Sequence, residues 1–292
     1  MDILPFDDRD GFIWMNGEII NWRDAKTHVI CHGLHYGSLV FEGERTYNGK
    51  IFKAEEHSIR LIESGKIMDM KIPWSKDELN NFKYELLKKN NLKDAYVRAF
   101  SWRGSEMMAV SAQKTKIHTA IAVWEWPSYF NPEAKMRGLN LDISDWKRPS
   151  QECAPVHAKA AGLYMICTLS KHEAERQGYS ESLMLDHEGY VAESTSANVF
   201  FKDNKGELHT PIPDCFLDGI TRRTVIDIAK SKNIKVVERK IKPEELLNFT
   251  GCFLTGTAAE VTPVSQIDKY KFTVCNVIKD LSESYQALVR KK

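Results

Sequence analysis

Two short stretches near the start of the chain alternate apolar and polar residues around an Asn-Gly pair. Residues 12–20 read Phe-Ile-Trp-Met-Asn-Gly-Glu-Ile-Ile, and Asn48-Gly49 divides residues 45–52 in the same way. Asn-Gly is the strongest short signal for a two-residue hairpin turn, so both stretches are predicted to be β-hairpins. This pattern favours an antiparallel sheet over a βαβ unit at the start of the chain.

Longer periodic segments follow the hairpins. Apolar residues at helical spacing predict helices over residues 54–70, 76–89, 159–177, 221–232 and 276–289. Short apolar runs predict strands over residues 95–102, 117–126, 139–146, 182–186, 190–192, 197–202, 207–210, 234–239 and 252–255. Helices and strands are mixed without a repeating βα unit, so an α+β fold is expected.

A break in periodicity divides the chain. Pro127, Ser128, Asn131, Pro132 and Gly138 lie close together, as in a linker. We therefore expect a small N-terminal domain over residues 1–130, an interdomain loop over 131–138 and a larger domain over 139–292. A chain of 292 residues is long enough for two domains.

The charge composition bears on whether the protein binds nucleic acid or membranes. Lys plus Arg number 41 against 40 for Asp plus Glu, giving a net charge of +1. Such a balance provides no global field to attract nucleic acid or an anionic membrane. No apolar run approaches the roughly 18 residues of a membrane span, and the first residues lack the features of a signal peptide. A cytoplasmic location is the resulting expectation.

The cysteines and histidines do not form a recognisable metal site. The six cysteines are scattered without a Cys-x-x-Cys pair, which favours reduced thiols over a zinc site or a disulfide framework. His28, His32 and His35 cluster in sequence, but no carboxylate lies among them. Packing or turn hydrogen bonds are therefore favoured over a metal site for these histidines, and no metal is predicted.

Lys159 stands out because its surroundings are uncharged. Residues 156–164 read Val-His-Ala-Lys-Ala-Ala-Gly-Leu-Tyr, and the next formal charge downstream is Lys171. Burial would lower the pKa of this lysine, as a nucleophilic or proton-transferring amine requires. On local grounds alone, a helix lysine whose amine reaches water is the favoured interpretation.

Three further features carry polar groups where core packing does not require them. Glu193 precedes a hydroxyl-rich turn, and is otherwise an ordinary surface acid. Gly219 and Thr221 lie at the start of a predicted helix, where backbone N–H groups favour an anion such as phosphate. The small residues of Thr255-Gly-Thr-Ala-Ala259 would let a backbone approach a ligand. An ordinary N-cap and a tight turn are the alternatives for these two segments.

The spacing of these features resembles the signature of the class IV (fold type IV) pyridoxal-phosphate aminotransferases. The matching residues are Glu193-x-Thr195-x-x-Asn198-Val199-Phe200, Leu208-x-Thr210 and Leu217-x-Gly219-Ile220-x-Arg222. Lys159 is similarly placed to the family's cofactor-binding lysine. Residues 35–37, 40–43, 96–98 and 255–263 resemble the branched-chain amino acid branch. The resemblance implies a two-domain α+β fold with a β-barrel-like core in the larger domain.

The resemblance also implies a role for each cofactor-binding residue. Lys159 would hold pyridoxal 5′-phosphate covalently and move the substrate proton, and Glu193 would keep the pyridine nitrogen protonated. Arg60 would bind the phosphate, and Tyr164 would contact the phenolic oxygen. The rest of the implied cofactor site is Leu217, Gly219, Ile220, Thr221, Gly256 and Thr257.

On the substrate side, the resemblance implies an apolar pocket with two carboxylate-binding groups. Tyr96 and the backbone of Thr257 and Ala258 would hold the α-carboxylate, and Arg98 would bind the distal carboxylate of glutamate. The pocket itself would be lined by Tyr36, Phe41, Gly43, Trp126, Tyr129 and Tyr164. Met107, Met108 and Val110 would reach a partner subunit, because family members are dimers or assemblies of dimers.

The expected activity is reversible transfer of the amino group of leucine, isoleucine or valine to 2-oxoglutarate. D-amino acid aminotransferase and aminodeoxychorismate lyase are the alternatives within the fold. A binding protein without catalysis is the alternative outside it, but it would require the loss of Lys159 or Glu193. Two positions depart from the family pattern: Ser196 replaces a common glycine, and Leu163 replaces an asparagine. If the turn needs a positive φ, Ser196 would be mildly strained.

Overall fold

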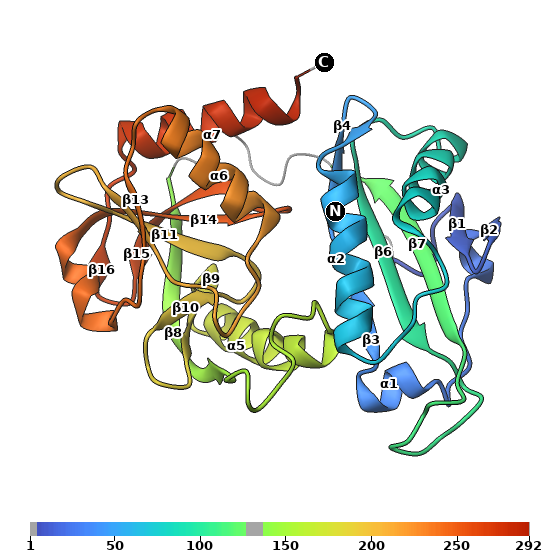
Figure 1. The fold of residues 1–292 in the computed structure, drawn as a ribbon. Coiled ribbons are helices and arrows are strands. Elements are labelled where there is room, and N and C mark those ends of the chain that lie inside the picture. Colours follow the sequence, from blue (N-terminus) through green and yellow to red (C-terminus); the bar gives the residue numbers. More distant parts are fainter. Residues whose placement is uncertain (1–4, 127–136, 292) are drawn as a thin grey trace. The chain divides into compact units, whose positions relative to one another are not determined.

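The computed structural model describes residues 5–126 and 137–291, which form two compact units (Figure 1). Unit 1 comprises Met1–Pro127 and Ala158–Gly162, and unit 2 comprises Ser128–His157 and Leu163–Lys292. The short segment with Lys159 therefore belongs to unit 1, whereas the sequence analysis placed it in the second domain. Each unit has its own sheet.

The sheet of unit 1 has seven strands in the order β2-β1-β7-β6-β4-β5, with β3 also paired to β6. All its pairs are antiparallel, as the two hairpins predicted. The left-handed φ values of 52° at Asn16 and Asn48 explain why Asn-Gly turns occur there. The strands are β1 (Phe12–Met15), β2 (Glu18–Asn21), β3 (Leu39–Phe41), β4 (Glu44–Tyr47), β5 (Lys50–Ile51), β6 (Ala95–Arg103) and β7 (Ile117–Glu125).

Two long helices pack on this sheet. Helix α2 (Ala54–Ile67) contacts β3 and β6, and α3 (Lys76–Lys89) contacts β1 and β7 (Figure 1). Ser75 and Glu78 form a capping box that starts α3. A buried ion pair of 2.7 Å between Lys83 and Glu44 joins α3 to β4. Shorter elements are η1 (Trp22–Asp24) and α1 (His32–Tyr36).

Unit 2 contains a mixed nine-stranded sheet that curls into half a barrel (Figure 1), which confirms the expected α+β fold with a barrel-like core. Its order is β10-β9-β8-β15-β14-β11-β12-β13, with β16 paired to β15. The strands are β8 (Leu139–Arg148), β9 (Glu181–Asp186), β10 (Val191–Ser194), β11 (Asn198–Asp203), β12 (Leu208–Thr210), β13 (Val236–Glu238), β14 (Phe249–Gly256), β15 (Glu260–Ile267) and β16 (Tyr270–Lys271).

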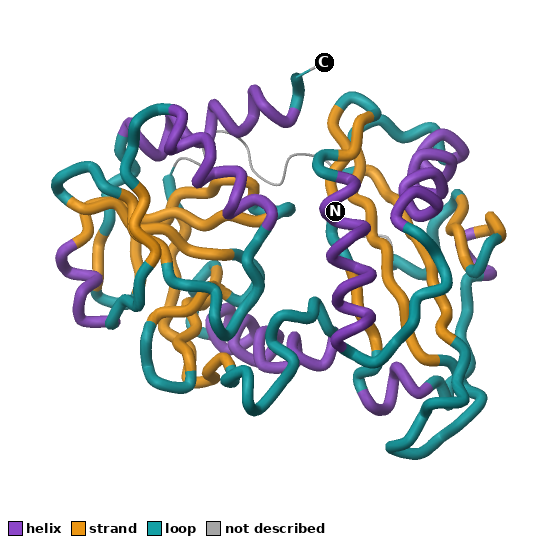
Figure 2. Tube along the Cα trace, in the orientation of Figure 1, coloured by secondary structure: helices purple, strands orange, loops and turns teal. Residues whose placement is uncertain are grey.

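The helices of unit 2 pack on different parts of this sheet. Helix α5 (Met165–Arg176) contacts β8 and β9, whereas α6 (Ile220–Ser231) and α7 (Asn276–Val289) contact β14 and α7 also contacts β15 (Figure 2). The short 3₁₀ helix η2 (Ala161–Tyr164) spans the point where the chain passes from unit 1 to unit 2. A second 3₁₀ helix, η3 (Pro243–Asn248), precedes β14. That core is apolar and includes Leu141, Leu183, Val199, Phe201, Leu254 and Val264.

The structure corrects two predicted elements and adds two strands that were not predicted. The helix predicted over 159–177 begins only at Met165, after the 3₁₀ turn η2. The predicted strand 252–255 is longer, and β15 and β16 were missed altogether. Pro263 lies inside β15, which pairs with both β14 and β8.

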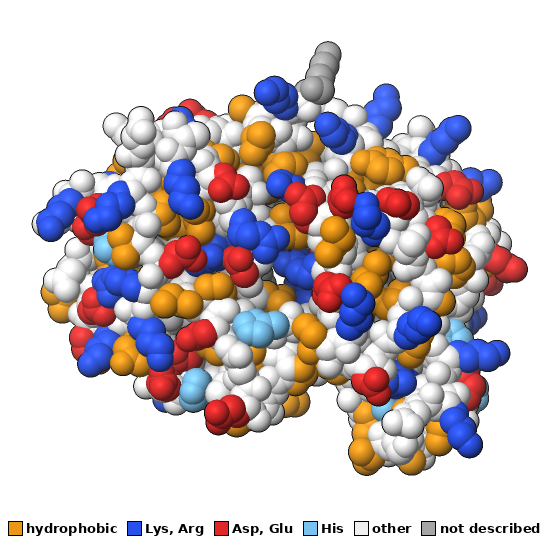
Figure 3. Space-filling view, in the orientation of Figure 1, with side chains coloured by type: hydrophobic (Ala, Val, Ile, Leu, Met, Phe, Trp, Pro, Cys, Tyr) orange, Lys and Arg blue, Asp and Glu red, His pale blue; other side chains and the backbone are white. Residues whose placement is uncertain are grey.

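The surface agrees with the balanced composition. Basic and acidic side chains are intermixed over the face seen in Figure 3, without a region of one sign. Within the described residues no helix is both long and apolar enough to span a membrane.

Candidate active site

Lys159 is fixed by backbone hydrogen bonds within unit 1. Its carbonyl oxygen accepts from the backbone N–H of Phe41 at 3.0 Å, and its own N–H donates to the Ser64 hydroxyl on α2 at 3.0 Å. The adjacent Ala160 forms a β-bridge with Val40. The lysine is therefore held by β3 and α2, in place of the helical hydrogen bonds that the sequence analysis expected.

The amine of Lys159 has a lowered pKa. Its Nζ lies 4.8 Å from the centre of the Phe41 ring. Desolvation, followed by the positive charge of Arg60, lowers the pKa to about 8, although Glu42 acts in the opposite direction. A substantial fraction of the amine is consequently neutral near physiological pH, as a nucleophile or base requires.

Arg60 lies beside Lys159 and is held by Glu42. Its Nε and Nη2 donate to the two oxygens of Glu42 at 2.7 and 2.8 Å, and His57 Nδ1 lies 2.7 Å from the same carboxylate. Burial alone would raise the pKa of Glu42, but the charges and hydrogen bonds of Arg60 and His57 hold that pKa well below its usual range. Glu42 lies in the short connection between β3 and β4, and it was given no role from the sequence.

The expected substrate-binding residues of unit 1 gather at β3 and β6. Arg98 Nη2 donates to the Tyr96 hydroxyl at 3.2 Å, and the Arg98 guanidinium lies 4.7 Å from the centre of the Phe41 ring. A side chain at Gly43 would place its Cβ 2.0 Å from that hydroxyl, so only glycine fits beside Tyr96. Trp126 packs on Tyr96 with ring centres 4.9 Å apart.

Two predicted pocket residues are not part of this group. Tyr36 ends α1, is 46% exposed and stacks on His32 at 4.6 Å. Tyr129 lies outside the described residues. The histidine cluster makes backbone contacts, such as His32 Nε2 with the Ala109 carbonyl at 3.0 Å and His35 Nε2 with the Val29 carbonyl at 2.9 Å. His32 thus makes a long-range packing contact and His35 a local one, in line with the expected packing or turn hydrogen bonds.

In unit 2, the carboxylate of Glu193 is held by two donors. Asn198 Nδ2 donates to its Oε2 at 3.2 Å, and Arg148 Nε lies 3.5 Å from its Oε1. The register of β10 shifts between Val191 and Glu193, and such a bulge re-aims the side chain that follows it. Arg148 is buried and also donates to the Leu163 carbonyl, next to Tyr164. The sequence analysis missed Arg148.

The turn before α6 leaves helical N–H groups without a capping side chain. Gly219 is the N-cap and makes no side-chain hydrogen bond, so the first N–H groups of α6, at Ile220 and Thr221, form the kind of site that attracts an anion. Asn198 Nδ2 also donates to the Leu217 carbonyl at 3.0 Å. One amide thus connects this turn to Glu193.

The loop from Thr255 to Ala258 lies beside the same asparagine. Asn198 is opposite Thr255 in the β11–β14 pair, and a Cβ at Gly256 would lie 3.3 Å from the Cβ of Ala197. The Thr255 hydroxyl is buried and makes no hydrogen bond within the described structure. Thr257 and Ala258 follow in this loop, and Asn198 lies beside Glu193, the Leu217 carbonyl and Thr255.

Ser196 is accommodated without strain. It does not have a positive φ, and its hydroxyl donates to Glu181 Oε2 at 3.3 Å. The glycine of other family members is therefore not required by the backbone at this turn.

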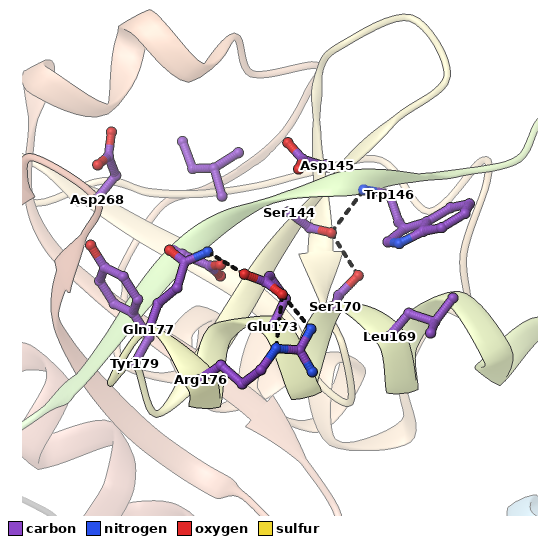
Figure 4. A pocket seen from close by; sticks show the side chains of 12 residues that line it. Ser144, Asp145, Trp146, Leu169, Ser170, Glu173, Arg176, Gln177, Tyr179 and Asp268 are labelled. Carbon is purple, nitrogen blue, oxygen red and sulfur yellow. Dashed lines mark hydrogen bonds and ion pairs between the residues drawn. The ribbon is translucent and has the colours of Figure 1, made fainter.

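A separate pocket of unit 2 contains none of the predicted residues. It lies between β8 and α5 and is lined by twelve residues, ten of which are labelled in Figure 4. Glu173 in this pocket accepts from Gln177 at 2.8 Å and from Arg176 Nε at 3.1 Å, and Ser144 bonds Ser170 at 2.6 Å. Its polar groups are thus largely occupied with one another.

Known proteins give an independent comparison. The sequence profile of the family described as amino-transferase class IV matches residues 39–267. The chain is 42% identical over 282 residues to the probable branched-chain-amino-acid aminotransferase of Rickettsia conorii, covering 95% of this chain and 96% of that protein. It is 41% identical over 293 residues to the branched-chain-amino-acid aminotransferase of Pseudomonas aeruginosa, covering 98% and 95%.

A solved structure of a branched-chain amino acid aminotransferase has a similar fold. The T.th. branched-chain amino acid aminotransferase with pyridoxamine 5′-phosphate matches with a TM-score of 0.93 and 37% identity, over 97% of this chain and 96% of that one. The match therefore extends over the whole fold as well as the motifs. Because the profile spans most of the sequence and the relatives cover nearly all of it, the chain belongs to the class IV aminotransferase family.

Proposed function

We propose that the chain catalyses reversible amino transfer between L-leucine, L-isoleucine or L-valine and 2-oxoglutarate, with pyridoxal 5′-phosphate bound to Lys159. The observation that carries this proposal is the partly buried lysine, whose pKa is lowered to about 8 and which lies beside Arg60 and Phe41. The names of the relatives support the same substrate class.

The residues present fit this cofactor. A phosphorylated pyridine needs a reactive amine, an acid for its ring nitrogen and an anion site, and the chain offers Lys159, Glu193 and the uncapped start of α6. When bound, the pyridoxal group supplies a ring that accepts the electrons of the bond broken at the substrate Cα. The remaining chemistry falls to side chains of this chain.

Lys159 and Glu193 are the two proton-handling groups. Lys159 Nζ would hold the cofactor and, once freed by the substrate amine, would move the proton from the substrate Cα to C4′ of the cofactor, and back in the reverse reaction. Glu193 is held by Asn198 and Arg148 and would keep the pyridine nitrogen protonated. Tyr164 contacts the phenolic oxygen of the cofactor.

The phosphate is bound by Arg60, the N–H groups of Ile220 and Thr221, and Thr257. Gly219 and Gly256 allow the backbone to approach, and Leu217 anchors the first turn through Asn198. Arg60, Ile220, Thr221 and Thr257 thus donate the hydrogen bonds, and the two glycines leave room for them.

Substrate selection combines apolar and ionic contacts. Tyr96 and the N–H groups of Thr257 and Ala258 bind the α-carboxylate, and Phe41 and Trp126 contact the branched side chain. Arg98 binds the distal carboxylate of 2-oxoglutarate as a bidentate partner. One pocket can then accept both an aliphatic and an acidic substrate.

We also infer self-association and a cytoplasmic location. Val110 is 85% exposed, Leu34 is 66% exposed, and a hydrogen bond from His32 to the Ala109 carbonyl brings their segments together. Exposed apolar side chains of this kind suit a contact with a second copy of the chain.

Assays with a panel of amino acids test the proposed activity. Purified protein with pyridoxal 5′-phosphate and 2-oxoglutarate should form glutamate from L-leucine, L-isoleucine and L-valine, and much less from D-alanine. Activity on D-alanine and none on L-leucine would contradict it and favour D-amino acid aminotransferase. Pyruvate release from aminodeoxychorismate would favour the lyase instead.

A further inference from the structure

Glu42 forms a clamp at the centre of unit 1. The residue is fully buried between β3 and β4, and its backbone N–H donates to the Ala99 carbonyl on β6 at 2.7 Å. Its carboxylate accepts two hydrogen bonds from Arg60 and contacts His57, and both partners lie on α2. The sheet and the helix are therefore joined through one carboxylate.

This clamp fixes the plane of the Arg60 guanidinium. Nε and Nη2 face the two oxygens of Glu42 side-on, so the remaining N–H groups point away from the carboxylate. A flexible arginine that is already immobilised loses less entropy when it binds an anion. The neighbours of Glu42 in sequence, Phe41 and Gly43, contact Lys159 and Tyr96, so the carboxylate also anchors that strand connection.

We propose that Glu42 is a positioning residue for phosphate binding, which holds the Arg60 guanidinium in the orientation that receives the phosphate of pyridoxal 5′-phosphate. This inference rests on the proposed function, because it takes Arg60 as a phosphate ligand. Glu42 itself faces Arg60 and His57 and acts through them.

A simpler role for Glu42 predicts the opposite result. If the carboxylate served only as a counter-charge, it would partly cancel the attraction between Arg60 and a phosphate dianion. Its neutralisation would then strengthen phosphate binding. Positioning predicts weaker binding, because the amide of Glu42→Gln offers one acceptor and one donor where Arg60 and His57 need acceptors.

The experiment measures the dissociation constant of pyridoxamine 5′-phosphate from the full-length apoprotein by calorimetry. Pyridoxamine without phosphate is the comparison ligand. We expect Glu42→Gln and Glu42→Asp each to raise the dissociation constant of pyridoxamine 5′-phosphate about tenfold and to leave that of pyridoxamine unchanged. Glu42→Asp keeps the charge but is too short for the two-oxygen contact. In Arg60→Gln, adding Glu42→Gln should cause no further loss.

Glu44→Gln is the matched control. Glu44 is also fully buried and lies two positions further on, but its partner is Lys83 on α3 at 2.7 Å. This variant should lower the melting temperature and leave the affinity for pyridoxamine 5′-phosphate unchanged. If Glu42→Gln fails to fold, Glu42→Asp carries the same test.

Three results would overturn this inference without affecting the proposed function. In the first, Glu42→Gln binds pyridoxamine 5′-phosphate as tightly as the wild type or more tightly, and in the second, Glu42→Asp binds it normally. In the third, the double variant loses the product of the affinity losses of Glu42→Gln and Arg60→Gln. The proposed function fails separately, if the wild type binds neither pyridoxamine 5′-phosphate nor pyridoxal 5′-phosphate.

Discussion

The amine of Lys159 illustrates how much one environment changes a common residue. With the ordinary lysine pKa of 10.5, only about 0.03% of the amine would be neutral at pH 7, whereas a pKa of about 8 leaves about a tenth of it neutral. Desolvation is the main cause, and the neighbouring charges are Arg60, Glu42 and Arg98, with Tyr96 also close. The nucleophile is therefore prepared by unit 1 itself.

A pH dependence follows from that shift. The neutral amine is the form that reacts with an aldehyde, and the fold lowers the pKa, so reactivity should appear as the pH rises through about 8. The rate of reconstitution of the apoprotein with pyridoxal 5′-phosphate, followed by absorbance between pH 7 and 11, should rise with a midpoint near pH 8 and level off above it. Free Nα-acetyl-lysine is the control, and a midpoint near 10.5 in the protein would refute the shift.

The family resemblance, and not the local pattern, assigned the roles of Lys159 and Glu193, for which a helix lysine and a surface acid remained as alternatives. Both residues could nevertheless be singled out, Lys159 by its uncharged neighbours and Glu193 by the turn that follows it. Glu42 and Arg148 could not, because their importance lies in partners far along the chain, such as Arg60 for Glu42 at a separation of 18 residues. An ion pair of that kind leaves no local pattern.

At the scale of elements, local turn chemistry was predictable and tertiary hydrogen bonding was not. Asn16 and Asn48 adopt the left-handed conformation that their hairpins require. The start of α5 was wrong because residues 158–162 have helical propensity, but Lys159 and Ala160 are bound to Ser64 and Val40 instead. Contacts to distant strands outweighed local preference there.

The start of α6 gives a prediction for an element. In Gly219→Ala the new Cβ would lie 2.2 Å from Asn198 Oδ1, so Asn198 must move away from Glu193 and the Leu217 carbonyl. Losing one such hydrogen bond costs about 1 kcal/mol, and we expect roughly fivefold weaker binding of pyridoxamine 5′-phosphate. Calorimetry on the apoprotein measures this.

Gly251→Ala provides the control for that variant. Its Cβ would meet the end of the Ile278 side chain at 3.1 Å and would not touch Asn198. It should keep the wild-type affinity. Unchanged affinity in Gly219→Ala would mean that Asn198 does not couple the turn to Glu193.

At the scale of the whole molecule, the exposed apolar residues of α1 and residues 108–110 suggest a contact surface on unit 1. Light scattering should give a mass of at least twice 33.5 kDa for the protein in solution. Val110→Asp should shift the mass toward a single chain, because a charge at the centre of an apolar contact is costly to desolvate. Lys66→Ala, on an exposed part of α2, should not. A wild-type mass of 33.5 kDa at every concentration would exclude this surface as a stable interface.

Lys159 is proposed both to hold the cofactor and to transfer the proton. The most direct measurement compares wild type, Lys159→Ala and Lys66→Ala for the absorbance of bound pyridoxal 5′-phosphate and for glutamate formation from L-leucine and 2-oxoglutarate. We predict that Lys159→Ala loses the absorbance band of the covalently held cofactor and at least about 10³-fold of the rate, since it removes both nucleophile and base, while Lys66→Ala matches the wild type. A Lys159→Ala protein that keeps the absorbance band and the rate would show that Lys159 neither holds the cofactor nor transfers the proton.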